Sequence, residues 1–252
     1  GDIAVLTGTE VLVTITPTMP APAGQLTLHE SVQVPLTPAA EGKLVGRVTV
    51  NTVVDYIRES SETEQLSRAG LREGEDIFAS VWDSVKNRWS WLAINMVTAF
   101  IASRVIGAFE GSIEKLVALA ALMPIVAGIG GNSGNQTITM IVRALALGQV
   151  QQESARVLLR KELGVAMVNG LIWGSLLGFV AWWLYRSVAL GAVMTAAMML
   201  NLIVAATVGV AVPLLRQRLG YDPAIGSSVL ITAVTDSGGF FIFLGLATVF
   251  LL

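Results

Sequence analysis

The chain has 252 residues, of which 54% are hydrophobic and 13% are charged, and its formal net charge is −2. Soluble domains carry about 25% charged residues, so this composition excludes an ordinary soluble protein. The small negative charge excludes nucleic acid as a partner, because no positive field would attract phosphates. The chain has no cysteine, which excludes disulfides, thiolate catalysis and thiolate metal sites.

The polar first third of the chain has the pattern of a small soluble α/β module followed by a charged helix. Residues 11–16, 32–36 and 44–50 are typical of strands, and we expect a helix between the first two. We assign residues 1–54 to this module and residues 55–88 to a charged connecting helix. A module of about 60 residues is near the lower size limit for a core that folds alone. We therefore expect it to pair with a second copy or with upstream sequence.

From residue 89 to residue 252 the chain consists of apolar runs long enough to cross a membrane. About 20 apolar residues span the roughly 30 Å hydrocarbon core, and these runs mostly lack the polar stripe of a helix in a soluble protein. The second run is too long for one straight crossing and contains Pro124 and a glycine cluster, so we expect a broken or kinked helix there. The five predicted transmembrane helices are residues 89–109, 115–145, 161–185, 188–214 and 223–252.

The basic residues in the connections predict the orientation. Lysine and arginine concentrate before the first span, between the second and third spans, and after the fourth, whereas the other connections carry few. Cytoplasmic loops are enriched in these residues. The N-terminus is therefore expected in the cytoplasm and the C-terminus outside, in a multi-pass protein surrounded by lipid.

Asp236 is the only acidic residue well inside the last span, where it follows Thr235. A carboxylate at mid-membrane costs on the order of 3 kcal/mol, so it needs a cation, a partner or a water-filled cavity. The sequence predicts a cation site here. The alternative is structural: an ion pair with Arg104 or Arg143, or a protonated carboxyl group bonded to a neighbouring helix.

The second polar feature of the membrane part is the run GIGGNSGNQT at residues 128–137. Its glycines would let the helix unwind and free backbone carbonyls, and an oxygen-rich lining at membrane depth suits a hard cation. The alternative is close helix packing, because Gly130 and Gly134 form a Gly-x-x-x-Gly pair, as do Gly174 and Gly178. The side chains that add neutral oxygens are Asn132, Asn135, Gln136 and Thr137.

Other polar residues in the spans are interpreted as interhelical hydrogen bonds rather than ligands. An enzyme is not predicted, because the spans contain no histidine for a serine–histidine pair and no second carboxylate to face Asp236. Redox work would need haem or cluster ligands that are missing. The polar residues in question are Asn95, Thr98, Asn169, Asn201 and Thr207.

Two separated motifs stand out in the membrane part. The first is MPIVAGIGGNSGNQT at residues 123–137, continuing to RALALG at 143–148, and the second is TAVTD at 232–236 with GFF at 239–241. Together they resemble the signature of the MgtE family of bacterial magnesium channels. The likeness extends from about Leu44 to the end of the chain, and the five spans and the predicted orientation agree with it.

The resemblance implies a homodimer in the bacterial cytoplasmic membrane with a Mg²⁺ pore on its two-fold axis. Asp236 of each subunit would face its twin around a largely hydrated ion, since Mg²⁺ dehydrates reluctantly. Asn132 and the carbonyls of Gly130 and Gly131 would lie beside that ion. Further pore-lining candidates are Asn135, Gln136, Thr137 and Thr235.

The soluble part also carries the resemblance. Residues 44–57 resemble the last part of a CBS domain (the cystathionine-β-synthase type of regulatory module), and the charged helix after them resembles the family's plug helix, which closes the pore when Mg²⁺ is plentiful. Thr52 stands where nucleotide-binding CBS domains typically have aspartate, so we do not expect adenosine nucleotides to bind. The acidic candidates for sensing cytosolic Mg²⁺ are Asp55, Glu59, Glu62, Glu73, Glu75 and Asp76.

The sequence and the resemblance therefore predict a channel-like, homodimeric Mg²⁺ transporter gated by cytosolic Mg²⁺, with Mg²⁺ as both the transported and the regulatory ion. Two alternatives stay open. An ion-coupled carrier of another divalent cation, such as Co²⁺ or Mn²⁺, would show the same broken helix and lone aspartate. A non-transporting membrane sensor of Mg²⁺ would show metal-dependent protection of the charged helix from protease but no ion flux.

Overall fold

The computed structural model describes the strands by their backbone and the other described residues with their side chains. The strands cover residues 3–7, 10–15, 24–28, 32–38 and 44–49, and the other described residues are 54, 55, 58, 66, 70, 71, 78–149, 155–224 and 226–252. The chain divides into two compact units, Gly1–Leu66 and Ser67–Leu252, and each is described by itself.

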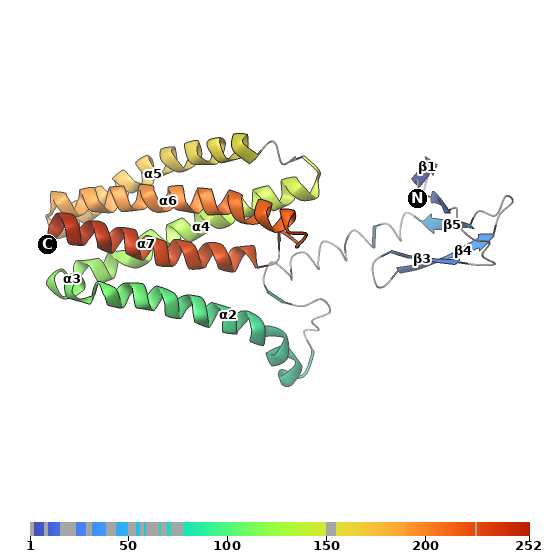
Figure 1. Ribbon diagram of the computed structural model, residues 1–252, viewed down its shortest axis with the longest axis horizontal. Helices are drawn as coiled ribbons and strands as arrows, with labels where there is room; N and C mark the ends of the chain where they lie inside the picture. Colours follow the sequence, from blue (N-terminus) through green and yellow to red (C-terminus); the bar gives the residue numbers. More distant parts are fainter. Residues whose placement is uncertain are drawn as a thin grey trace. The chain divides into compact units, whose positions relative to one another are not determined.

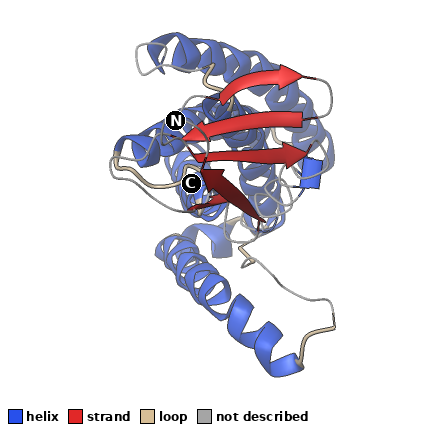
Figure 2. Cartoon of the chain, turned by 90° about the vertical axis from the view of Figure 1, so that its right-hand side faces the viewer, coloured by secondary structure: helices blue, strands red, loops and turns tan. Residues whose placement is uncertain are grey.

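The described part of the first unit is a five-stranded sheet in the order β1-β2-β5-β4-β3, with every neighbouring pair antiparallel (Figure 2). Three strands correspond to those expected from the sequence. The expected helix between the first two of them is wrong over residues 24–28, because GQLTL alternates polar and apolar residues with the period of a strand and pairs with β4. A CBS-type module remains a prediction. The strands are β1 Ile3–Thr7, β2 Glu10–Ile15, β3 Gly24–Leu28, β4 Val32–Pro38 and β5 Leu44–Thr49.

The second unit is a helical bundle (Figure 1). Each of its five long helices overlaps one of the five predicted spans, which confirms the α-helical membrane fold. α2 begins at Val81, within the segment that we assigned to the connecting helix, and α5 also begins before the predicted span. By length and composition, α2, α5, α6 and α7 could each cross a membrane. α4 has a similar length, but the polar residues of its glycine-rich run lower its hydropathy. The helices are α2 Val81–Ala108, the short α3 Glu110–Lys115, α4 Ala118–Ala146, α5 Ala155–Tyr185, α6 Val188–Arg218 and α7 Ser227–Leu251.

Helices α4, α6 and α7 pack against one another at the centre of this unit, while α5 packs on α6 and α2 packs on α7 (Figure 1). Many side chains between the central helices have no exposed surface, for example Val126, Met194 and Phe243. Lipid tails are as apolar as these side chains, so close van der Waals packing and hydrogen bonds hold such helices together.

Glycines bring α5 and α6 into backbone contact. A Cβ atom added to Gly178 would lie 2.5 Å from the Gly191 carbonyl oxygen, and one added to Gly191 would lie 2.6 Å from the Gly178 carbonyl oxygen. The Thr195 hydroxyl donates across the same contact to the Gly174 carbonyl at 3.0 Å. The packing interpretation of Gly174 and Gly178 is therefore confirmed.

Helix α4 is continuous from Ala118 to Ala146, so the expectation of a break in this helix is wrong. The reason is packing. A Cβ atom at Gly130 would overlap with the side chain of Asn201 on α6, and one at Gly134 would overlap with Ile231 on α7. The glycines make room for neighbouring side chains within a continuous helix, as the packing alternative predicted. Pro124 lies inside this helix and cannot donate a backbone hydrogen bond, and a kink there stays a prediction.

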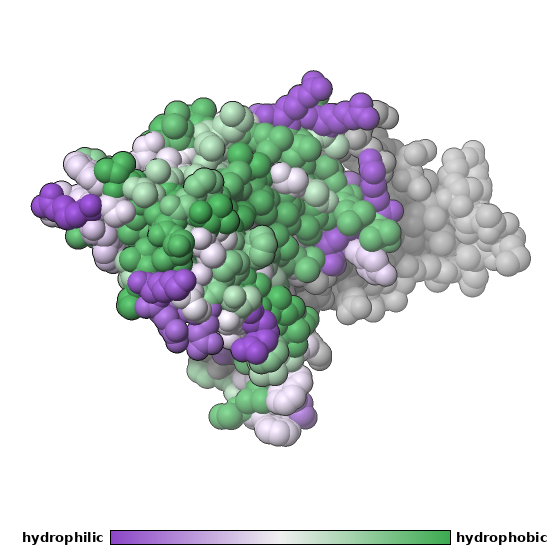
Figure 3. Space-filling model, turned by 60° about the vertical axis from the view of Figure 1, so that its left-hand side comes forward, coloured by the Kyte–Doolittle hydropathy of each residue, from purple (hydrophilic) through white to green (hydrophobic). Residues whose placement is uncertain are grey.

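The outer surface of the bundle is apolar. Large hydrophobic side chains are exposed along α2 and along one face of α5, including Phe100, Leu171 and Phe179. Figure 3 shows hydrophobic residues over the middle of one face and hydrophilic residues gathered towards its ends. Such a belt is what the hydrocarbon core of a bilayer would cover.

Candidate functional site

Asp236 lies in the first half of α7, half-buried, as a carboxylate inside a membrane-spanning helix. Within the described residues it forms no hydrogen bond or ion pair. The ion pair with Arg104 or Arg143 that we considered is not formed there: Arg104 lies over the Phe100 ring, with 5.6 Å from its guanidinium carbon to the ring centre. An intramembrane carboxylate without a partner among the described residues is suited to bind a cation, water or a second copy of the chain.

The contact between α4 and α7 places the predicted ligands of the two helices near one another. Gly131 faces Thr235, because a Cβ atom added to this glycine would lie 3.4 Å from the threonine Oγ1. Both residues are buried. Asn132 and Asp236 are the next residues on the two helices, and both are at least partly exposed. The predicted site is thus an open polar surface flanking a tight helix crossing.

The remaining predicted pore residues do not share one surface. Asn135 lines a pocket of about 190 Å³ between α4 and α7, together with Ser228. Gln136 is exposed. Thr137 is buried and donates to the Glu162 Oε2 on α5 at 3.1 Å, and Thr235 donates to the Ile231 carbonyl of its own helix at 2.8 Å. A continuous helix turns successive side chains by about 100°, so only part of this run can face any one cavity.

Asn201 on α6 connects the two helices that carry the predicted ligands. Its side chain is fully buried and donates through Nδ2 to the Val126 carbonyl of α4 at 2.9 Å. It fits into notches at Gly130 on α4 and Gly239 on α7. A Cβ atom added to Gly130 would overlap with the Asn201 side chain, and one added to Gly239 would lie 2.7 Å from its Nδ2. Its Oδ1 has no hydrogen-bond partner within the described part of the chain. The predicted interhelical role of Asn201 is confirmed.

Three of the other polar residues for which we predicted interhelical bonds behave differently from Asn201. Asn95 and Thr98 bond to carbonyls of α2, and Thr207 bonds to the Ile203 carbonyl of α6. The interhelical role predicted for these three is therefore wrong. Short polar side chains in a helix reach the carbonyl three or four residues earlier, and this local bond satisfies them without a second helix.

Glu162 is a buried carboxylate that the sequence analysis did not single out. It is 4% exposed, accepts a hydrogen bond from Thr137, and lies 3.4 Å from the Lys161 Nζ. In the sequence, Glu162 is an acidic residue next to a cluster of basic residues at the start of a span. This pattern is typical of a solvated loop, so it does not indicate a buried carboxylate. The structure instead places its carboxylate against α4, where its bond to Thr137 links the two helices.

Of the six acidic candidates for Mg²⁺ sensing, only Asp55 lies within the described residues, and it is exposed. Glu59, Glu62, Glu73, Glu75 and Asp76 lie outside them. Within the described residues, no three His, Cys, Asp or Glu side chains gather in a group that could hold a metal ion.

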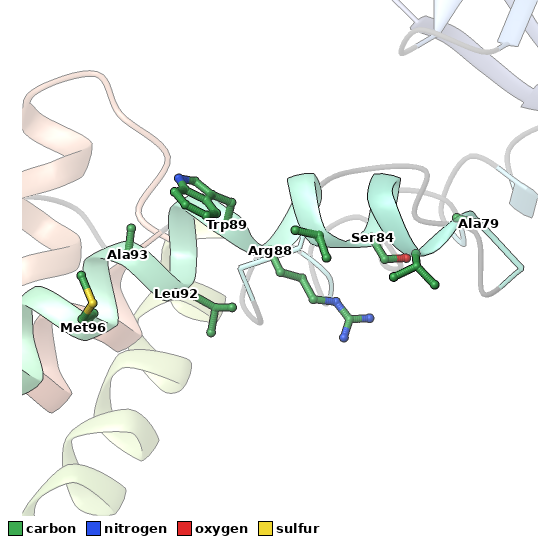
Figure 4. A pocket seen from close by; sticks show the side chains of 9 residues that line it. Ala79, Ser84, Arg88, Trp89, Leu92, Ala93 and Met96 are labelled. Carbon is green, nitrogen blue, oxygen red and sulfur yellow. The ribbon is translucent and has the colours of Figure 1, made fainter.

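A pocket of about 570 Å³ lies along the first half of α2 (Figure 4). Ser84, Arg88, Leu92 and Met96 are among the side chains that line it. None of the predicted ion-site residues lines this pocket, so it is separate from Asp236.

The bundle and its isolated carboxylate define a polytopic α-helical membrane protein with a polar site between two central helices. Residues 123–246 match the family model MgtE, described as a divalent cation transporter. The chain is 35% identical over 214 residues to the magnesium transporter MgtE of Thermus thermophilus, covering 84% of this chain and 47% of that protein. It is 30% identical over 211 residues to the magnesium transporter MgtE of Bacillus subtilis, covering 82% and 46%.

Through this membrane domain the chain belongs to the MgtE family. The matched segment contains every predicted pore residue from Gly130 to Asp236. A third relative, the magnesium transporter MgtE of Enterococcus faecalis, is 26% identical over 223 residues, or 88% of this chain and 49% of that protein. The chain thus spans about half the length of the curated relatives that it matches.

Proposed function

We propose that this protein transports Mg²⁺ across the bacterial cytoplasmic membrane through a pore formed by two copies of the chain. The observation that carries the proposal is Asp236, a half-buried carboxylate inside a membrane helix without a partner in the described residues. The relatives' names, which specify magnesium, support the choice of ion.

A second copy would supply the second carboxylate. Two-fold symmetry presents the same residue twice on opposite sides of an axis, so Asp236 would face its twin. Mg²⁺ keeps several of its waters, and a pair of carboxylates can hold that hydrated ion without stripping it. Asn132, exposed beside the Gly131–Thr235 contact, would bond to the same water shell.

The channel-like mechanism follows from the chemistry of this site. One carboxylate per subunit gives binding that is weak enough for an ion to leave, and conduction requires both entry and release. A membrane potential that is negative inside drives Mg²⁺ inward through such a pore, whatever the orientation of the protein. Closure of the pore by cytosolic Mg²⁺ through the acidic candidates, including Asp55, belongs to the same proposal.

The test is Mg²⁺ uptake into liposomes that contain the purified chain, read by an internal Mg²⁺-sensitive dye at a fixed membrane potential. The variant Asp236→Asn keeps the shape of the side chain and removes its charge. We expect uptake to fall by about tenfold or more, the factor that corresponds to 1.4 kcal/mol of lost ion stabilisation, while the dimer stays folded.

Asp83→Asn is the matched control, because Asp83 is exposed in the first turn of α2, away from the predicted site. Its uptake should equal that of the unmodified chain. Full uptake by the Asp236→Asn variant would refute the ion site. Uptake that saturates and requires a Na⁺ or H⁺ gradient would replace the channel by a coupled carrier.

A further inference from the structure

A groove of about 360 Å³ opens between the start of α5 and the end of α6. Its walls are mostly apolar: Leu159 comes from α5, and Val210, Ala211 and Leu214 come from α6. Val210 is buried and forms the floor, in contact with a small cluster that includes Leu145 of α4. The groove is therefore a built apolar depression between two transmembrane helices.

The glycine contacts between α5 and α6 lie away from the groove. The backbones of the two helices touch at Gly178 and Gly191, and the glycine contacts extend to Gly170, which faces Met199. Beyond these residues, towards the start of α5, leucine side chains stand between the helices. The two helices separate there and leave the space that the groove occupies.

Two arginines line the groove where the helices end. Arg156 lies in the first turn of α5 and Arg218 is the last residue of α6. Both are exposed, and neither forms an ion pair within the described residues. The first N–H groups of a helix have no partner inside the helix and favour an anion, so the start of α5 adds to the positive field of the two guanidinium groups.

We propose that this groove binds one anionic phospholipid, with the phosphate held between Arg156 and Arg218 and an acyl chain against the apolar walls. A basic pocket between transmembrane helices on the cytoplasmic side is suited to an anionic headgroup, and arginine binds phosphate oxygens through two parallel hydrogen bonds. The apolar floor at Val210 favours a lipid over a soluble phosphate. The site is separate from Asp236 and does not depend on the proposed ion pathway.

The experiment is native mass spectrometry of the full chain in detergent, titrated with phosphatidylglycerol, and with phosphatidylcholine as the zwitterionic reference. We expect one phosphatidylglycerol per chain to be retained at lower lipid concentration than phosphatidylcholine. Arg156→Gln and Arg218→Gln should each weaken this retention about fivefold, and together about 25-fold, as expected for one charge each near a membrane surface.

Two further variants separate a built site from general attraction. Arg160→Gln removes a charge one turn further along α5 that does not line the groove, and it should leave retention unchanged. Ala211→Trp keeps all charges but fills the apolar part, and it should abolish the preference for one bound lipid. Equal loss in Arg160→Gln, or full retention in the double arginine variant, would overturn the proposal.

Competition and cross-linking test the other occupants. Glycerol phosphate carries the headgroup charge without acyl chains, so displacement of the lipid at equal concentration would show a site for soluble phosphate instead. The chain has no cysteine, so Ala211→Cys introduces a single thiol into the groove. A disulfide between two copies in liposomes would show that a second chain covers the groove, and this result would also overturn the proposal.

Discussion

The contact of α5 with α6 and the contacts of α4 with α6 and α7 all depend on glycines four residues apart, but they use these glycines differently. In α5–α6 the glycines let two backbones touch, as at Gly178 and Gly191. In the central helices the notches hold side chains: Asn201 enters at Gly130, and Ile231 enters at Gly134. The same Gly-x-x-x-Gly spacing therefore indicates close approach, and the neighbouring helix decides whether a backbone or a side chain fills the space.

The largest expected effect comes from Gly178→Ala. The added Cβ would overlap with the Thr195 hydroxyl and would lie 2.5 Å from the Gly191 carbonyl oxygen. The hydroxyl can turn away, but the backbone oxygen cannot move without separating the helices. We expect a loss of about 3 kcal/mol, the upper part of the range for overpacked cores, measured as lowered thermal stability in detergent. Adding Thr195→Ala to this variant should not restore its thermal stability. Gly164→Ala on the same helix meets nothing within 4 Å and should be neutral or slightly stabilising.

A smaller and rescuable effect is expected for Gly130→Ala. The new methyl group would displace Asn201 and break its bond to the Val126 carbonyl, at a cost of about 1–3 kcal/mol. Because the obstacle is a side chain, Asn201→Ala should relieve it. Unfolding of the two single variants and the double variant should give a favourable coupling of about 1 kcal/mol. Strictly additive losses would show that Gly130 and Asn201 do not compete for the same space. Gly128→Ala, which meets nothing within 4 Å, is the control.

The smallest effect should come from Thr195→Val. This change keeps the shape and removes the hydroxyl that donates to the Gly174 and Gly191 carbonyls, each at 3.0 Å. Hydrogen bonds between membrane helices average about 0.6 kcal/mol, so thermal stability should fall only slightly. A loss as large as that of Gly178→Ala would mean that the hydrogen bond, rather than backbone contact, holds α5 to α6.

The spans and the isolated carboxylate could be predicted from the sequence because they are local properties. A run of apolar residues shows its length directly, and Asp236 is conspicuous in any such run. The strand at residues 24–28 could also have been found, since its alternation is local; the expectation of a helix there passed over that pattern.

The arrangement of the polar run could not be predicted in the same way. Its glycines permit unwinding as well as packing, and only the positions of Asn201 and Ile231 decide in favour of a continuous α4. Once the helix is continuous, Thr137 faces α5 instead of sharing a cavity with its neighbours. Glu162 escaped notice for the same reason, because its burial depends on a partner that lies far away in the sequence.

The position of α2 has a consequence for the order of assembly. This helix buries only Ala102 among its residues, and it joins the bundle through α7, where the Phe109 and Phe241 rings meet with centres 5.9 Å apart. Among the described helices, α2 is the first long one in the chain and α7 is the last. The main contact of α2 with the bundle therefore cannot form until α7 has been synthesised.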